Sequence, residues 1–345
     1  MLKDNIYALD LQELQSFLNK FNFPLYHAQQ IFSWVYQKNT ESFALMSNLP
    51  LALRQKLEEH FSFSALKLEN LLKSKDGTEK FLLQLNDGNF IEAVVIPAEK
   101  RATACLSTQV GCKYACRFCA SGFSGFKKNL SAAEIIAELL FLIRHSQHKK
   151  ITHIVFMGSG EPLDNYDSVF KAVRIINAPY ALNIGARRIT ISTCGIIPGI
   201  KKLAQENLQV ELSVSLHASC DKTRSAIMPV NKKYPLKELL RACREYTART
   251  NRQITFEYVL IKGLNSSLKD AQNLSKILKD VRLAKVNLIP SNTVKECAVR
   301  PPERGEILPF KDYLAKSGLA VTLRRSRGED IEAACGQLRL RYEKN

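Results

Sequence analysis

Apolar residues recur at helical spacing through the first sixty positions of the chain. The pattern is interrupted at Asn48-Leu49-Pro50, where a proline and its neighbours are typical of a break between helices. The apolar positions that define the helical faces are Leu11, Leu14, Leu18, Ile31, Phe32, Val35 and those within 51–57. The pattern therefore predicts a small N-terminal helical domain over residues 1–62.

The pattern changes to two short apolar runs on either side of a turn. Residues 80–85 and 89–96 read as strands, and Asp87-Gly88 between them is a strong hairpin signal. Glu92 lies in the second run, and an alternating strand commonly exposes such a carboxylate to solvent. We therefore expect a β-hairpin extension over residues 63–100.

From about residue 104 strand patterns alternate with helical ones. Strict alternation implies parallel strands joined by right-handed crossovers, and about six units favour a partial (β/α)6 barrel of the α/β class over residues 101–345. The expected strands are 154–158, 188–193, 210–216, 254–261, 286–290 and 320–324, preceded by one before residue 112, and the expected helices are 131–146, 166–177, 198–206, 236–249, 267–280 and 308–317. In such a fold the active residues lie at the C-terminal ends of the strands.

The positive charge is concentrated in this predicted barrel. The chain carries 50 Lys and Arg against 33 Asp and Glu, a net charge of +17, and residues 1–100 hold only ten of the cationic and twelve of the acidic residues. Residues 101–345 therefore hold 40 Lys and Arg against 21 Asp and Glu. Such a surface favours binding of nucleic-acid phosphates, with a lysine-rich solubility surface as the alternative. No apolar run reaches membrane-spanning length, so we expect a soluble, cytoplasmic protein without a membrane partner.

Three cysteines, Cys112, Cys116 and Cys119, lie within eight residues at C-x3-C-x2-C spacing. Three thiolates fit a [4Fe–4S] cluster with one iron left open, because such clusters normally take four cysteines. A structural zinc site also needs four ligands, and no second cysteine pair follows at suitable spacing. Three buried cysteines without a cofactor are the remaining alternative, but Lys113 and Arg117 between them do not suit a core element.

This spacing resembles that of the radical S-adenosylmethionine (SAM) enzymes. The resemblance implies that SAM chelates the open iron and that an electron from the cluster cleaves it to a 5′-deoxyadenosyl radical. Glycines let a backbone approach such a ligand, and carboxylates, hydroxyls and amides can bond its ammonium and ribose groups. The candidate SAM-binding residues at the predicted strand ends are Gly160, Glu161, Ser192, Ser215, Leu216, His217 and Asn292. The alternatives are that residues 158–162 form a turn that binds no ligand and that His217 is a hydrogen-bonded histidine of the core.

The chain also resembles, from about residue 20 to 340, the RlmN/Cfr family of radical SAM adenine methyltransferases that act on large-subunit ribosomal RNA. The motifs that carry the resemblance are 101–105 (RATAC), 109–112 (QVGC), 128–130 (KNL), 160–162 (GEP), 215–218 (SLHA), 229–231 (PVN), 287–290 (NLIP) and 327–338 (RGEDIEAACGQL). The last of these is the most diagnostic. One departure is Ser159, where the family usually has methionine, and we expect it to alter a loop packing contact.

The resemblance implies roles for two further cysteines. Cys335 accepts a methyl group from one SAM, a second SAM provides the radical that takes a hydrogen from it, and the resulting carbon radical adds to adenine. Cys105 then resolves the protein–RNA adduct by forming a disulfide with Cys335, and Glu92 matches the proposed proton acceptor. The cationic run 324–327 is expected to favour the Cys335 thiolate. Cys194, Cys220, Cys243 and Cys297 are expected to be structural.

The resemblance thus implies methylation of carbon 2 of an adenine in 23S ribosomal RNA, with a transfer-RNA adenine beside the anticodon left open as a second substrate. Carbon 8 is the alternative, and retention of Pro162 favours carbon 2. An iron–sulfur RNA-binding redox protein without methyltransferase activity is the alternative of another class. The implied partners are 23S ribosomal RNA and an electron donor such as flavodoxin or ferredoxin, and transfer RNA is left open as a further partner. The enzyme is expected to be a monomer.

Overall fold

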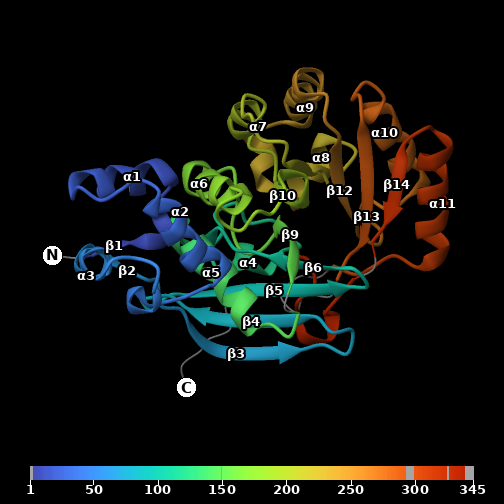
Figure 1. Ribbon diagram of the computed structural model, residues 1–345. Coiled ribbons are helices and arrows are strands. Elements are labelled where there is room, and N and C mark those ends of the chain that lie inside the picture. The colour runs from blue at the N-terminus through green and yellow to red at the C-terminus, as the bar shows by residue number, and fades with distance from the viewer. Residues whose placement is uncertain (1–2, 149, 293–298, 325, 339–345) are drawn as a thin grey trace.

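The computed structural model describes residues 3–148, 150–292, 299–324 and 326–338. Its centre is a ten-stranded sheet in the order β14-β13-β12-β11-β10-β9-β6-β5-β4-β3. The seven strands from β6 to β14 are parallel, and β5, β4 and β3 continue the sheet in antiparallel fashion. Figure 1 shows the parallel strands with helices on one side and the antiparallel strands below them.

The parallel part is the partial (β/α)6 barrel that the sequence predicts. Its strands are β6 (Arg101–Cys105), β9 (Ile151–Phe156), β10 (Ile189–Thr193), β11 (Glu211–Ser215), β12 (Ile254–Leu260), β13 (Ala284–Pro290) and β14 (Ala320–Leu323). Six crossovers join them, through α5 (Ala132–His145), α6 (Tyr166–Asn177), α7 (Ile197–Leu203), α9 (Leu236–Thr250), α10 (Leu268–Leu278) and α11 (Arg304–Lys316). The sheet stays open, with β14 and β3 at its edges.

One helix begins earlier than expected, and a short helix after β11 was not expected. The helix expected from 308 begins at Arg304 instead, because Glu303 and Glu306 form a reciprocal capping box ahead of Pro309. The short helix α8 (Asp221–Ile227) was not predicted, since a seven-residue segment has too few turns to show a clear apolar period. It lies between β11 and α9, next to the 3₁₀ turn Pro229–Lys232.

The hairpin is part of the same sheet as the barrel. Its predicted strands are β4 (Glu79–Gln84) and β5 (Phe90–Ala98), and β5 pairs with the first barrel strand so that Val94 faces Cys105. A third strand, β3 (Lys67–Lys73), was missed because almost all of its residues are exposed or half-buried and show no apolar alternation. The short pair β7 (Gln109–Gly111) and β8 (Phe126–Asn129) flanks the cysteine segment and was also missed.

The N-terminal residues form the expected helices and pack directly on the barrel. The elements are β1 (Asp4–Asn5), α1 (Leu11–Lys20), α2 (His27–Phe32), α3 (Leu51–His60) and β2 (Phe61–Ser62). One continuous core runs from Ile6 into the barrel, and ten of the 14 residues of α5 are buried because this helix lies between the sheet and the N-terminal segment. Among the described residues no helix is long and apolar enough to cross a membrane.

Candidate functional site

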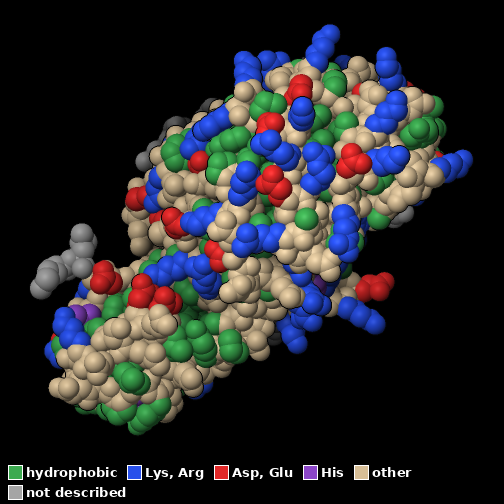
Figure 2. Space-filling view, turned by 90° about the horizontal axis from the view of Figure 1, so that it is seen from above, with side chains coloured by type: hydrophobic (Ala, Val, Ile, Leu, Met, Phe, Trp, Pro, Cys, Tyr) green, Lys and Arg blue, Asp and Glu red, His purple; other side chains and the backbone are tan. Residues whose placement is uncertain are grey.

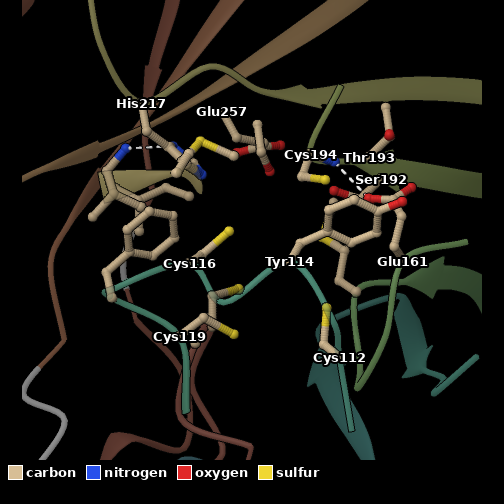
Figure 3. Close-up of a pocket in the computed structure, with 18 of the residues that line it drawn as sticks. Cys112, Tyr114, Cys116, Cys119, Glu161, Ser192, Thr193, Cys194, His217 and Glu257 are labelled. Atoms are coloured by element: carbon tan, nitrogen blue, oxygen red, sulfur yellow. Dashed lines mark hydrogen bonds between the residues drawn. The ribbon is translucent and has the colours of Figure 1, made fainter. Parts of the chain in front are cut away.

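A pocket lies at the C-terminal ends of the parallel strands, where the fold predicts it. Every barrel strand from β9 to β14 contributes to its wall at or just past its last residues. The candidate residues that line it are Cys112, Cys116, Cys119, Gly160, Glu161, Ser192, Ser215, His217, Asn292 and Cys335. Figure 3 shows the three cysteines on one side of this space, with Glu161, Cys194 and Glu257 facing them.

The cysteines are presented by the loop between β7 and the short helix α4 (Ala120–Phe123). The loop turns sharply, with Ala115 in the left-handed region (φ 48°) and the Cys119 amide donating to the Cys116 carbonyl at 3.0 Å. It is tied to α8 by a hydrogen bond from the Arg117 amide to the Ile227 carbonyl, 2.9 Å. These contacts hold the three thiols on the same side of the pocket.

The environment of these thiols fits a cluster that takes thiolate ligands. Burial raises the pKa of Cys112 to about 12 and raises the pKa values of Cys116 and Cys119 as well, and the cysteines add to one another's shift. Free thiols here stay protonated, and iron would replace those protons. No three His, Cys, Asp or Glu side chains among the described residues converge on a point suited to one metal ion. A cuboidal cluster does not need such convergence, because each cysteine binds a different iron.

Glu161 is held rigidly opposite the cysteines. Its carboxylate accepts hydrogen bonds from the Leu163 amide (3.0 Å) and the Cys194 amide (2.7 Å), while burial raises its pKa. Gly160 before it has φ +102°, and a Cβ there would lie 2.6 Å from the Gln109 Cβ. Glycine is therefore required at this position by the backbone itself.

Ser159 forms two hydrogen bonds within the loop packing around the 158–162 turn. Its hydroxyl donates to the Gly111 carbonyl at 3.3 Å and its amide donates to the Ser107 hydroxyl at 3.0 Å. The side chain is buried and ties the 158–162 turn to the segment that precedes the cysteines.

His217 is a neutral hydrogen-bond donor in the pocket wall. The Val259 amide donates to its Nδ1 at 3.1 Å, so the ring proton lies on Nε2, and burial lowers the pKa of the ring to about 3. Phe118 of the cysteine loop packs edge-on against the ring, with centroids 4.7 Å apart. Leu216 beside it packs in the core and does not line the pocket, so its contact with SAM stays a prediction.

Glu257 and Cys194 are among the pocket residues that were not selected from the sequence. Glu257 is a buried carboxylate on β12 that accepts from Asn287 Nδ2 (2.7 Å) and from the Ser213 hydroxyl (3.3 Å), and burial raises its pKa. It is the only charged residue of the run 254–260, and only the sheet register reveals its position. Cys194, expected to be structural, also lines the pocket beside Glu161.

Cys335 lines both this pocket and a smaller cavity that also contains Cys105. Both are free thiols. The pKa of Cys105 is raised to about 12, mainly by burial and secondly by the neighbouring Cys335. Two cysteines 230 positions apart in the sequence are thus brought to one cavity by β6 and the C-terminal segment.

Within the cationic run 324–327, Arg324 is the residue that interacts electrostatically with Cys335. The pKa of Arg324 is raised, with Cys335 as the largest cause. Arg327 turns instead toward Asp76, 3.8 Å away, and the Ser326 hydroxyl donates to Asn292 Oδ1 at 2.5 Å. Arg325 and Cys297 lie outside the described residues.

The segment that carries Cys335 is fastened at several points. Asn292 Nδ2 donates to the Cys335 carbonyl at 3.0 Å, so its amide holds this loop as well as facing the pocket. The Ala120 amide donates to the Gly336 carbonyl at 2.7 Å, which joins the segment to the cysteine loop. On the hairpin side the Gly328 amide donates to Asp76 Oδ2 at 3.1 Å. The hairpin extension therefore positions the Cys335 segment.

Glu92 lies outside the pocket. It is buried and forms an ion pair with Lys80 at 3.1 Å, and the same Lys80 Nζ donates to the Glu332 carbonyl at 3.0 Å. In the register of β5 it lies two residues from Val94, the partner of Cys105, and so on the same sheet face. Its role as a proton acceptor stays a prediction.

Comparison with known proteins identifies the family. Residues 106–274 match the radical SAM superfamily, and residues 4–63 match the N-terminal domain of the ribosomal RNA large subunit methyltransferases. A Dictyoglomus turgidum protein named "Probable dual-specificity RNA methyltransferase RlmN" is 47% identical over 345 residues, covering 99% of this chain and 98% of the relative. The chain belongs to the RlmN family. A Clostridium botulinum RlmN is 46% identical, with coverage of 99% and 97%.

A solved structure agrees with the family and the fold. The crystal structure of a radical SAM methyltransferase from Sphaerobacter thermophilus superposes with a TM-score of 0.93 at 42% identity, covering 97% of this chain and 99% of that one. RlmN proteins are thus radical SAM enzymes, and the superfamily uses a [4Fe–4S] cluster and SAM. The cysteine loop of the present chain offers the thiol ligands that this chemistry needs.

Proposed function

We propose that this enzyme methylates carbon 2 of an adenine in 23S ribosomal RNA, and of a transfer-RNA adenine beside the anticodon. The observation that carries the proposal is the position of Cys335, which borders both the cysteine-loop pocket and the cavity of Cys105. A methyl carrier must face SAM on one side and its resolving thiol on the other. The relatives' printed name, dual-specificity RNA methyltransferase, supports two RNA substrates.

In this proposal Cys112, Cys116 and Cys119 hold the cluster, and Glu161, Ser192, Ser215, His217 and Asn292 bind SAM with the 158–162 turn. The cluster, when bound, supplies the electron that cleaves SAM to methionine and a 5′-deoxyadenosyl radical. The neutral His217 ring offers its Nε2 proton to an acceptor in the pocket. The buried carboxylate of Glu161 has lone pairs left for a cationic group.

The remaining chemistry falls on the chain's own thiols. The Cys335 sulfur forms a bond to the methyl carbon of one SAM, and the bond from that carbon to the sulfonium sulfur breaks. Arg324 borders the same cavity as this sulfur, and Cys335 is the largest cause of the rise in the pKa of Arg324. In this proposal the 5′-deoxyadenosyl radical from a second SAM takes a hydrogen atom from the Cys335 S-methyl group, and the resulting methylene radical adds to carbon 2 of adenine. Carbon 2 then gives its proton to Glu92, and the adduct gives up one electron, for which the cluster would be the acceptor. The Cys105 sulfur finally bonds to the Cys335 sulfur while the bond from Cys335 to the methylene carbon breaks, and that carbon keeps the electron pair and takes up the Cys105 proton to become the product methyl group.

Residues 1–62 act as an accessory domain and residues 63–100 position the Cys335 segment, while residues 101–345 form the catalytic core. A small reduced redox protein such as flavodoxin or ferredoxin supplies the electron. The enzyme works as a monomer in the cytoplasm, where ribosomal RNA is available. Pro162 in the Gly-Glu-Pro turn favours carbon 2 over carbon 8.

The direct test uses anaerobically reconstituted protein, SAM carrying a labelled methyl group, and large-subunit RNA. We expect the label in 2-methyladenosine after nuclease digestion and mass analysis, and S-methylcysteine at Cys335 before RNA is added. Label in 8-methyladenosine would assign the enzyme to the carbon-8 class. A SAM-responsive cluster without either methylated species would indicate a redox protein and contradict the proposal.

RNA binding should weaken steeply with salt. Figure 2 shows many Lys and Arg side chains, with fewer carboxylates, over the barrel part of the molecule. If about six of them contact phosphates, counterion release lowers affinity roughly a thousandfold between about 50 and 200 mM salt. Filter binding or fluorescence anisotropy across that range checks this, with SAM binding as the control that should change little. A flat RNA-binding curve would show that the charge serves solubility.

A further inference from the structure

Arg224 on α8 is the largest completely buried side chain of the described residues, and its hydrogen bonds all go to neutral groups. A buried guanidinium is expensive to desolvate and is usually paired with a carboxylate. The acceptors are the carbonyls of Leu216 (3.2 Å), Tyr234 (3.4 Å), Cys194 (2.7 Å) and Ser215 (3.2 Å) and the side-chain oxygen of Asn231 (2.8 Å). These bonds fix the guanidinium without neutralising its charge.

The carboxylate on the same helix is engaged elsewhere. Asp221 Oδ1 accepts from Asn231 Nδ2 at 2.8 Å and from the Leu236 amide at 2.9 Å. Desolvation lowers the pKa of Arg224, and the groups that oppose this shift are led by Cys194 and Cys116 ahead of Asp221. The Asp221 carboxylate therefore does not pair with the Arg224 guanidinium.

Arg224 stands directly behind the pocket wall. The Cys194 and Ser215 carbonyls that it binds belong to residues that line the pocket. Its helix ends at Ile227, whose carbonyl accepts the Arg117 amide of the cysteine loop. The guanidinium therefore lies behind the wall of the pocket that the three cysteines line.

We propose that Arg224 is a positioned counter-charge for the iron–sulfur cluster, which makes the cluster easier to reduce. This inference rests on the proposed cluster at Cys112, Cys116 and Cys119. Three thiolates give the cluster a net charge of about minus one when oxidised and about minus two when reduced. A fixed positive charge in a poorly polarisable interior stabilises the reduced form more than the oxidised form. The effect acts on the electron-transfer step, while the five hydrogen bonds hold the charge in place.

The test is the midpoint potential of the reconstituted full-length protein, followed by electron paramagnetic resonance during a dithionite titration. In Arg224→Gln the equilibrium constant for one-electron reduction should fall at least tenfold, a shift of about 59 mV to lower potential. Arg224→Lys keeps the charge and should recover most of that shift. Arg252→Gln, which removes a cation paired with Glu211 at the opposite end of the barrel, should leave the potential unchanged.

A second pair of variants keeps Arg224 and its hydrogen bonds. Cys243 is fully buried on α9, and Arg224 is the leading charge acting on it. Cys243→Asp would supply the missing carboxylate and should lower the potential as Arg224→Gln does, while the similarly sized Cys243→Asn should not. If Arg224→Gln loses its iron, the potentials of Cys243→Asp and Cys243→Asn provide the test of the inference. Unchanged potentials in iron-replete Arg224→Gln or Cys243→Asp would overturn the inference. Failure of the wild-type protein to hold a four-iron cluster would instead refute the proposed function.

Discussion

The Cys105→Ala variant is expected to attach itself covalently to its RNA substrate and to stop there. Cys335 can still receive a methyl group and join adenine through it, but no thiol remains to displace the product. The variant should accumulate a protein–RNA species that survives denaturing electrophoresis and disappears on nuclease digestion. Product release should fall by at least a hundredfold, roughly the effect of losing a reacting group.

The Cys335→Ala variant should fail at an earlier step. Without the methyl carrier it should form neither S-methylcysteine nor any RNA adduct, and the Cys105→Ala/Cys335→Ala double variant should behave in the same way. Cys220→Ala is the matched control, because Cys220 is exposed at the start of α8 and borders neither cavity. An adduct that maps to Cys194, or normal turnover by Cys105→Ala, would show that the thiols are assigned wrongly.

The environment of Cys105 suits a thiol that reacts only once the adduct exists. It packs among Val94, Ala333 and Leu338, and burial raises its pKa to about 12, so it stays protonated and unreactive in the resting enzyme. Arg324 acts on both cysteines and opposes that rise for Cys105. Resolution therefore requires a local change that removes the Cys105 proton.

The barrel was predictable because its periodicity is strong. The helix at Tyr166–Asn177 and the strand at Ile254–Leu260 match their expected ranges almost residue for residue, since the helix has a clear apolar period of 3.6 and the strand is a short run rich in β-branched and aromatic residues. Parallel order followed from alternation alone. The placement of residues around one pocket followed in turn, because parallel strands end on the same edge.

The missed features depend on tertiary contacts that leave no local pattern. None of the residues of β3 is fully buried, and its register with β4 gives it a structure that its own residues do not indicate. Glu257 became visible as a pocket residue only when β12 was placed between β11 and β13. Likewise, nothing in the sequence alone links Asp76 to Gly328, although this hydrogen bond helps to hold the Cys335 segment. The shared cavity of Cys105 and Cys335 was expected only through the family resemblance.

Replacing Cys112, Cys116 or Cys119 singly by alanine should abolish SAM cleavage. Each loss leaves one iron without its thiolate, so iron analysis should fall well below the roughly four irons per protein of a complete cluster. The electron paramagnetic resonance spectrum of the reduced wild-type protein should change on addition of SAM, and the variants should lose this response. Stoichiometric zinc in the wild-type protein would contradict the assignment.

Cys194 provides the most demanding control, because its thiol lines the same pocket and interacts electrostatically with both Cys112 and Cys116. If it were a fourth ligand, all four irons would carry cysteine and SAM would find no open site. We expect Cys194→Ala to retain about four irons and the spectral response to SAM, because Cys194 faces Glu161 and its backbone already holds that carboxylate. Loss of iron in Cys194→Ala, with a wild-type spectrum indifferent to SAM, would mean that the cluster is saturated by four thiolates and serves electron transfer only.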